Sequence, residues 1–112
     1  MNLDILNEFD GSVTICGLDG TIIFMNEKAI VSFEKYGGKK LVGTNMFDCH
    51  PEDAQTKIKE IIDNKRTNAY TISKNGVKKL IFQSPWYEDG EIKGLVELSL
   101  ELPEEMPHFE RK

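Results

Sequence analysis

Alternating apolar and polar residues occur in two separate parts of the chain, one near its start and one toward its end. Three turn dipeptides divide these parts: Asp19-Gly20, Asn75-Gly76 and Asp89-Gly90. Asp-Gly and Asn-Gly are strong hairpin signals, because both residues tolerate the positive φ that tight turns require. The pattern predicts one antiparallel sheet that a helical insert interrupts, an arrangement that can enclose a small-molecule pocket.

Five strands are expected around these turns. β-Branched and aromatic residues with a period of two favour strands, and turn residues bound each run. The first two strands would form a hairpin, and the last three would form a meander. The predicted strands cover residues 13–17, 21–25, 68–73, 77–87 and 91–101.

The rest of the chain favours helices. Residues 2–9 predict a short N-terminal helix, and Asn26 is a good N-cap for a helix over residues 27–36. Short helical turns are expected over residues 39–50. Pro51 begins the longest helix, because proline suits the first helical turn. The apolar rows of that helix contain Ala54, Ile58, Ile61 and Ile62.

The strand predicted over residues 21–25 is apolar on both faces. Ile22 and Phe24 would point one way, and Ile23 and Met25 the other. A strand that is buried on both sides needs a partner on each side. One face should meet the core, and the other should meet the N-terminal helix or a second subunit. The candidate dimer-interface residues are Leu3, Leu6, Ile23 and Met25.

The later strands supply candidates for the pocket lining. Alternate residues of the strand over 77–87 share one face, which we expect beneath the helices, and Leu98 of the last strand should face the same way. A completely filled core is the more ordinary interpretation of the same pattern, and the sequence leaves both open. If Ser84 faces in, its hydroxyl would be available to a ligand or would simply be satisfied within the protein. The candidate pocket residues are Phe47, His50, Ile58, Leu80, Phe82, Ser84, Trp86 and Leu98.

Composition and charge exclude several classes of protein. The 112 residues include 14 basic and 19 acidic side chains, for a net charge of −5. The basic residues are scattered rather than gathered in a stripe with aromatics, so nucleic-acid binding is not expected. The longest apolar stretch, residues 22–25, is too short to span a membrane. Residues 1–8 have neither the basic start nor the apolar run that is typical of a signal peptide, and two cysteines make no disulfide framework, so we expect a cytoplasmic setting.

The order of these elements and the residues around the turns resemble a PAS domain. The run from Gly17 to Asn26 is similar to the first PAS hairpin and to the Asn that closes it. The runs 41–43, 46–47 and 50–53 are similar to the segment that precedes the long connecting helix of PAS domains. The run from Tyr87 to Leu95 resembles the last PAS hairpin, so the resemblance covers nearly the whole chain.

The resemblance implies an α+β fold: a five-stranded antiparallel sheet with helices packed on one face around a small cavity. Residues 1–10 would form an N-terminal helix or cap, residues 11–102 the PAS-like domain, and residues 103–112 an extended tail. Many PAS domains dimerise through the outer sheet face and an N-terminal helix. Because no effector domain follows the sheet here, the expected partners are a second copy of the chain and a separate effector protein, unless the chain is a fragment.

The resemblance also raises the question of a cofactor. A His in this region can be the axial haem ligand of a haem-binding PAS domain, and His50 is the candidate. Its place before Pro51, at the positive end of a helix dipole, favours the neutral imidazole that ligates iron. Capping or surface exposure is its more ordinary role. Flavin is not expected, because the light-sensing subclass has a reactive Cys directly after an Asn, whereas Asn45 is followed by Met46.

The expected function is a non-catalytic sensory module that binds a small ligand or cofactor and signals through a dimer or partner interface. The alternatives are a pure dimerisation or protein-interaction module with a filled core, and a haem-based redox or gas sensor that uses His50. Cys49 and His50 are sequence neighbours that usually point apart, and no positioned acid completes a catalytic set, so an enzyme is not expected. A metal site of full protein ligation is not expected either.

Overall fold

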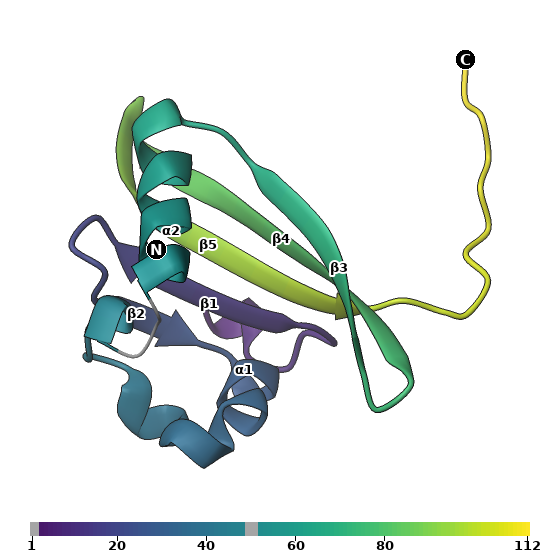
Figure 1. Cartoon of the computed structure of the whole chain (residues 1–112), viewed down its shortest axis with the longest axis horizontal. Coiled ribbons are helices and arrows are strands. Elements are labelled where there is room, and N and C mark those ends of the chain that lie inside the picture. The colour runs from purple at the N-terminus through teal and green to yellow at the C-terminus, as the bar shows by residue number, and fades with distance from the viewer. Residues whose placement is uncertain (1–2, 49–51) are drawn as a thin grey trace.

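The chain folds into a five-stranded antiparallel sheet with helices against one face (Figure 1). The structure, a computed structural model, describes residues 3–48 and 52–112. The strand order is β2-β1-β5-β4-β3, and this arrangement confirms the expected α+β fold. The helices, 3₁₀ turns (η) and strands are η1 (Asp4–Leu6), β1 (Ser12–Gly17), β2 (Ile22–Met25), α1 (Glu27–Ser32), η2 (Glu34–Tyr36), η3 (Gly38–Leu41), η4 (Met46–Asp48), α2 (Glu52–Asn64), β3 (Asn68–Lys74), β4 (Val77–Glu88) and β5 (Glu91–Glu101).

Two of the three predicted turns are two-residue hairpin turns. Asn75 and Gly76 have φ values of 54° and 79°, and Asp89 and Gly90 have values of 51° and 80°. Two consecutive positive φ values are the signature of the type I′ turn, which matches the twist of the flanking strands. These turns join β3 to β4 and β4 to β5 and confirm the predicted meander.

The turn at Asp19-Gly20 is longer than a two-residue turn. The Gly20 amide donates to the Gly17 carbonyl over 3.0 Å, and the Gly17 amide donates to the Thr21 carbonyl over 2.9 Å. Gly20 alone has a positive φ, at 88°. This is the three-residue hairpin loop in which a glycine in the left-handed region follows a tight turn. The hairpin of β1 and β2 is confirmed with this longer loop.

The helical insert is more broken than its sequence pattern indicates. The helix expected over residues 27–36 stops after Ser32, and the chain continues through Phe33 into the 3₁₀ turn η2. Gly37 and Gly38 then take φ values of 121° and 53°, which favour glycine and turn the chain into η3. The expected N-terminal helix is a single 3₁₀ turn, η1. The longest helix, α2, is as expected, with Ile58 and Ile61 buried.

The two faces of the sheet carry side chains opposite to the prediction. In β4, the buried residues are Ile81, Gln83 and Pro85, so the intervening residues lie on the other face. Cross-strand partners share a face, and Gln83 pairs with Glu97 while Phe82 pairs with Leu98. The side facing the helices, called here the inner face, therefore includes Gln83, Leu95 and Glu97. The predicted lining set lies on the opposite, outer face: Leu80, Phe82, Ser84, Trp86 and Leu98.

A bulge in the first hairpin changes the faces of β2 as well. The register between β1 and β2 shifts between Ile15 and Cys16. As a result, Ile22 and Met25 both lie on the inner face and are 7% and 5% exposed. The prediction that Ile23 and Met25 share an outward face was wrong, because a bulged strand does not keep its period of two through the extra residue. Ile23 is exposed.

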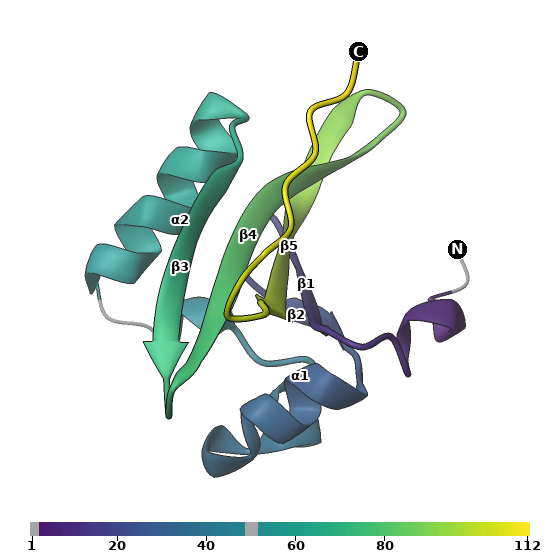
Figure 2. The same cartoon turned by 90° about the vertical axis from the view of Figure 1, so that its right-hand side faces the viewer.

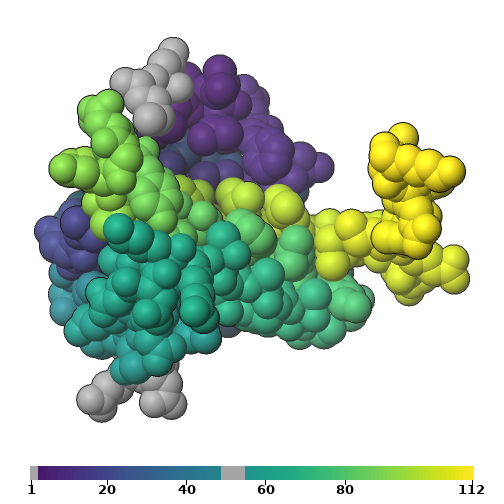
Figure 3. Space-filling model, turned by 90° about the horizontal axis from the view of Figure 1, so that it is seen from above, coloured from purple at the N-terminus to yellow at the C-terminus, as the bar shows by residue number. Residues whose placement is uncertain are grey.

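The N-terminal segment lies on the other side of the sheet from α2 (Figures 2 and 3). Phe9 and Leu100 both flank Gly11, within 3 Å of the position that a Cβ of Gly11 would take. Leu100 is an outer-face residue, since it pairs with Leu80. The segment thus covers one end of the outer face. At the other end of the chain, residues 103–112 form no helix or strand and project from the body (Figures 1 and 3).

Asn26 connects this N-terminal segment to the sheet and to α1. Its Oδ1 atom caps α1 by accepting from the Ala29 amide over 3.1 Å, as predicted, and also accepts from the Val13 amide over 2.9 Å. Its Nδ2 atom donates to the carbonyls of Leu6 and Gly11 over 3.0 and 2.8 Å. Asn26 is completely buried, and its one side chain satisfies four backbone groups. In the part of the chain that the structure describes, no helix is long and apolar enough to cross a membrane.

Candidate functional site

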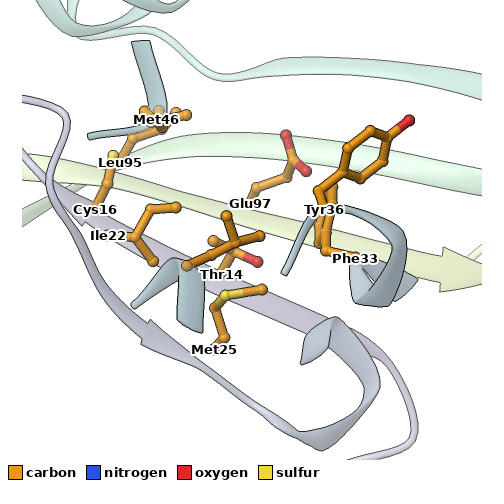
Figure 4. Close-up of a pocket in the computed structure, with 10 residues that line it drawn as sticks. Thr14, Cys16, Ile22, Met25, Phe33, Tyr36, Met46, Leu95 and Glu97 are labelled. Carbon is orange, nitrogen blue, oxygen red and sulfur yellow. The ribbon is translucent and has the colours of Figure 1, made fainter. Parts of the chain in front are cut away.

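A cavity of about 260 Å³ lies between the inner face and the helical insert (Figure 4). The sheet contributes its floor from β1, β2 and β5, and the wall comes from the segment that runs from α1 to η4. Most of its lining is apolar, as is typical of small-molecule sites. The lining residues are Thr14, Cys16, Ile22, Met25, Phe33, Tyr36, Leu41, Met46, Leu95 and Glu97.

Backbone hydrogen bonds hold the cavity wall to the edge of the sheet. The Gly43 amide donates to the Ile22 carbonyl over 2.8 Å, and the Ile22 amide donates to the Thr44 carbonyl over 2.9 Å. The Met46 amide donates to the Gly20 carbonyl over 2.8 Å. These bonds pair residues 43–46 with β2 and with the hairpin loop that precedes it. They place the buried Met46 side chain over the sheet and close one end of the cavity.

Glu97 and Thr14 form the polar part of the sheet floor. They are cross-strand partners on β5 and β1, and both are half-buried. The row continues across the sheet, since Glu97 pairs with Gln83 and Gln83 pairs with Asn68. The Asn68 amide donates to Oε1 of Gln83 over 2.9 Å, and the Gln83 amide donates to Oε2 of Glu97 over 2.8 Å. The chain of bonds holds the carboxylate in place beside the cavity.

Cys16 contributes a thiol to the cavity lining. The residue is 3% exposed, and burial raises the pKa of its thiol above the ordinary value. A thiol with a raised pKa holds little of the thiolate that acts as nucleophile. Cys16 therefore acts as a small apolar lining residue rather than as a reactive group.

A second hollow follows the same inner face beyond Phe33. It shares Phe33 and Glu97 with the cavity and is lined further by Tyr70, Ile72 and Ile81 from β3 and β4. Burial is the main reason that the pKa of the Tyr70 hydroxyl is raised, and the Glu97 carboxylate adds to the effect. The Glu97 carboxylate also contributes to raising the pKa of the Cys16 thiol, so its charge acts on a group in the cavity and on one in this hollow.

The sequence-predicted pocket residues are divided among three places. Ile58 is buried in the core cluster with Met46 and Leu95, and Phe47 packs against that cluster. The Phe47 ring also has the Lys59 Nζ atom 5.4 Å from its centroid. His50, the haem-ligand candidate, lies outside the described residues, as do Cys49 and Pro51. The remaining candidates occupy the outer face.

On that outer face, Trp86 lies across β5. Its indole Nε1 donates to the Cys16 carbonyl on β1 over 3.0 Å, and its cross-strand partner on the intervening strand is Gly94. A Cβ on Gly94 would lie 2.7 Å from this indole nitrogen and 1.9 Å from the Cys16 carbonyl oxygen. Glycine is required here, because the carbonyl and the indole occupy the space that a side chain would need.

The predicted dimer-interface residues are also separated. Met25 lines the cavity, whereas Ile23 is 48% exposed at the edge strand β2. Leu3 and Leu6 are half-buried at the N-terminal segment. Of the four, Leu3, Leu6 and Ile23 are therefore accessible to a second molecule in this structure, and Met25 is not.

Sequence reasoning did not identify Glu97, Thr14 or the cavity wall. Alternation along the last strand places Glu97 on the face opposite to Leu98, so the expected face of Leu98 beneath the helices left Glu97 on the other side. A usable signal is the polar row itself: Asn68, Gln83 and Glu97 interrupt three neighbouring strands, and each can satisfy the next.

No protein-family model matches the sequence, and no curated protein matches it significantly. The structure, however, is similar to known ones. A sensory box sensor histidine kinase from Vibrio cholerae matches with a TM-score of 0.62 and 18% identity, over 89% of this chain and 88% of that one. The Aer2 receptor from Vibrio cholerae, a dual PAS-haem oxygen sensor, matches with a TM-score of 0.64 and 15% identity, over 83% and 95%.

A third similar structure is that of VqmA bound to DPO, with a TM-score of 0.67 and 14% identity. The match covers 89% of this chain but 56% of VqmA, so the chain spans about half of that receptor. Together with the strand order and the helical insert, these similarities show that the chain has the PAS-like fold of sensor domains. They confirm the resemblance noted in the sequence at the level of the fold.

Proposed function

We propose that this chain is a non-catalytic sensory module that binds a small ligand between its sheet and its helical insert. The observation that carries the proposal is the cavity, which is mostly apolar and has a carboxylate fixed at its floor. A few placed polar groups in an apolar cavity are the usual composition of a ligand site. Its volume of about 260 Å³ lies just under the range of about 300–1,000 Å³ for ligand sites, which favours a compact ligand.

Two of the similar structures support a sensory role. VqmA binds DPO, and Aer2 is a haem oxygen sensor. Both are similar to this chain in fold at low identity, so we take from them the role of the fold and not the ligand. For this chain, a ligand would act by stabilising one packing of the insert against the sheet. Ligand binding shifts such an equilibrium only by the difference between its affinities for the two packings.

We further propose that the signal passes through a homodimer formed by the outer face and the N-terminal segment. The outer face carries an apolar set from four neighbouring strands, and these residues are half-buried rather than covered. VqmA, one of the similar structures, forms a dimer. An apolar surface of this kind gains free energy when a second copy covers it. The proposed interface residues are Ile15, Phe24, Leu80, Phe82, Val96 and Leu98, with Leu3, Leu6 and Ile23 beside them.

Ligand binding can be tested with benzyl alcohol, a compact neutral probe. We expect a titration followed by ¹H–¹⁵N NMR spectra to shift the amide signals of lining residues on β1, β2, α1 and η4. Signals of the turns at residues 75–76 and 89–90 serve as internal controls, because they lie away from the cavity. Shifts spread over the whole surface, or no shifts at millimolar probe, would contradict a ligand cavity and leave a pure dimerisation module as the function.

A further inference from the structure

We infer that the cavity takes a compact, largely apolar ligand that presents an N–H donor or a protonated nitrogen to the Glu97 carboxylate. The inference rests on the ligand-binding function proposed above and adds the chemical class of the ligand. It follows from where Glu97 lies, from how its two oxygens are used, and from the charges around it.

The position of Glu97 comes from the sheet register. Glu97 pairs with Thr14 on one side and with Gln83 on the other, and the sheet directs all three side chains to the inner face. Figure 4 shows Glu97 and Thr14 on the sheet, with Phe33 and Tyr36 of the insert beside them. Among the described lining residues, Glu97 is the one with a formal charge.

The Gln83 side chain occupies one oxygen of the carboxylate. Its amide donates to Oε2 of Glu97, and the Asn68 amide donates in turn to Gln83. Within the described part of the chain, no side chain donates to Oε1. An ionised carboxylate is an acceptor only, and it accepts several hydrogen bonds. The second oxygen is therefore available to a donor that enters the cavity.

The apolar surroundings strengthen the preference for a donor. Cys16, Met25, Leu41 and Leu95 line the same cavity as the carboxylate, so much of the surface that a ligand meets there is apolar. A half-buried carboxylate gains from a charged or strong donor, and a charge-assisted hydrogen bond is about twice as strong as a neutral one. A ligand carboxylate at the same place would meet like charge.

Two basic residues lie along the neighbouring hollow. Lys74 and Lys79 line that hollow with Tyr70, and it joins the cavity at Phe33 and Glu97. The described lining of the cavity itself contains no basic side chain. Inside the cavity, the cation that balances Glu97 would have to come from the ligand.

The test compares three probes of the same shape: benzylamine, benzyl alcohol and benzoate. At pH 7 the first is a cation, the second is neutral and the third is an anion. We expect NMR titrations to give benzylamine an affinity about tenfold or more above that of benzyl alcohol, in line with a charge-assisted bond, and to show the weakest binding for benzoate. The ionic strength is kept equal in all three titrations.

The variant Glu97→Gln removes the charge and keeps the shape and the bond to Gln83. We expect it to lose the preference for benzylamine, measured as the ratio of the benzylamine affinity to the benzyl alcohol affinity. The matched control is Glu101→Gln, which lies on the same strand and face but outside the cavity lining. This control should keep the preference.

The outcomes separate the two proposals. If benzyl alcohol binds at the lining but benzylamine binds no better, or if Glu97→Gln keeps the preference, the inference about the ligand class is wrong and the ligand cavity stands. If neither benzyl alcohol nor benzylamine shifts the lining signals, the ligand cavity itself is wrong. A preference for benzoate would also overturn the inference.

Discussion

Asn26 shows how much of the architecture can depend on one buried side chain. Its role as an N-cap could be read from its place before a helical run, because Asn is a favoured capping residue. Its three other bonds, to Val13, Leu6 and Gly11, join segments that are distant in the sequence. Those bonds depend on the tertiary structure, so the sequence pattern gave no sign of them.

The variant Asn26→Asp tests this role. It keeps the shape and both accepted bonds but removes the two N–H donors, and it places a negative charge beside two carbonyl oxygens. We expect the free energy of unfolding to fall by about 2–5 kcal/mol, since each buried polar group left unpaired costs about 1–3 kcal/mol. Urea denaturation followed by circular dichroism measures the change.

The control for this variant is Asn75→Asp, in the exposed turn between β3 and β4. Asp and Asn both suit the first position of a type I′ turn, so we expect a change within about 0.5 kcal/mol. If both substitutions change the free energy of unfolding equally, the Asn26 N–H donors contribute no more to stability than the amide of an exposed turn residue.

At the scale of elements, the strands could be predicted well, but the side of the sheet that faces the helices could not. The range of β5 was predicted to the residue, and the meander turns were correct. The turn at Asp89-Gly90 pairs Glu88 with Glu91, a register that would place Phe82 opposite Glu97. An irregularity at Trp86 and Tyr87 shifts the pairing by one residue, so Phe82 shares its face with Leu98 instead.

The candidate site was wrong for a different reason: Phe82 and Leu98 share a face as predicted, but that face lies on the side of the sheet away from the helices. Because the face assignment was reversed, the outer-face aromatics were taken as lining, and Glu97 was taken as solvent-exposed. The insert was the second obstacle, since short 3₁₀ turns have no strong periodicity. The residues that it contributes to the cavity, such as Phe33 and Leu41, depend on Gly37 and Gly38 turning the chain.

The variant Gly94→Ala tests the described packing of the Trp86 indole and the Cys16 carbonyl against Gly94. Replacing it with Ala would place a methyl group against the Cys16 carbonyl and the Trp86 indole, at a φ of 158°. We expect Gly94→Ala to lower the free energy of unfolding by about 2–4 kcal/mol. The fluorescence of Trp86, the single tryptophan of the chain, should change as well, because the indole must move.

The matched control is Gly17→Ala at the cross-strand partner of Gly94. The nearest atom to a Cβ there is 3.4 Å away on the Asp19 side chain, which is an ordinary contact. We expect a change of about 1 kcal/mol or less and an unchanged fluorescence spectrum. A stable Gly94→Ala variant with the wild-type spectrum would contradict the described packing of Trp86.

At the scale of the whole molecule, the proposed homodimer predicts that a disruptive substitution on the outer face lowers the mass of the assembly in solution. The half-buried Phe82 lies in the middle of that face, between partners on β3 and β5. We expect the wild type to be a dimer by size-exclusion chromatography with light scattering, and Phe82→Glu to weaken the dimer at least about tenfold, since a buried unpaired charge is costly.

Val31→Glu is the control for this experiment. Val31 is 66% exposed on α1, away from the outer face, and the same change of chemistry there should leave the dimer intact. A monomeric wild type, or a dimer that Phe82→Glu leaves unaffected, would show that the outer face is not the interface.

The most direct test of the proposed ligand cavity is a titration of a variant in which a larger side chain fills that cavity from the sheet. Thr14→Phe adds an aromatic ring inside the cavity, whereas Val96→Phe makes a similar change at a half-buried β-branched residue on the outer face. We predict that Thr14→Phe abolishes the benzyl alcohol shifts at the lining residues and that Val96→Phe keeps them. Wild-type shifts in a folded Thr14→Phe variant would contradict a ligand site in this cavity.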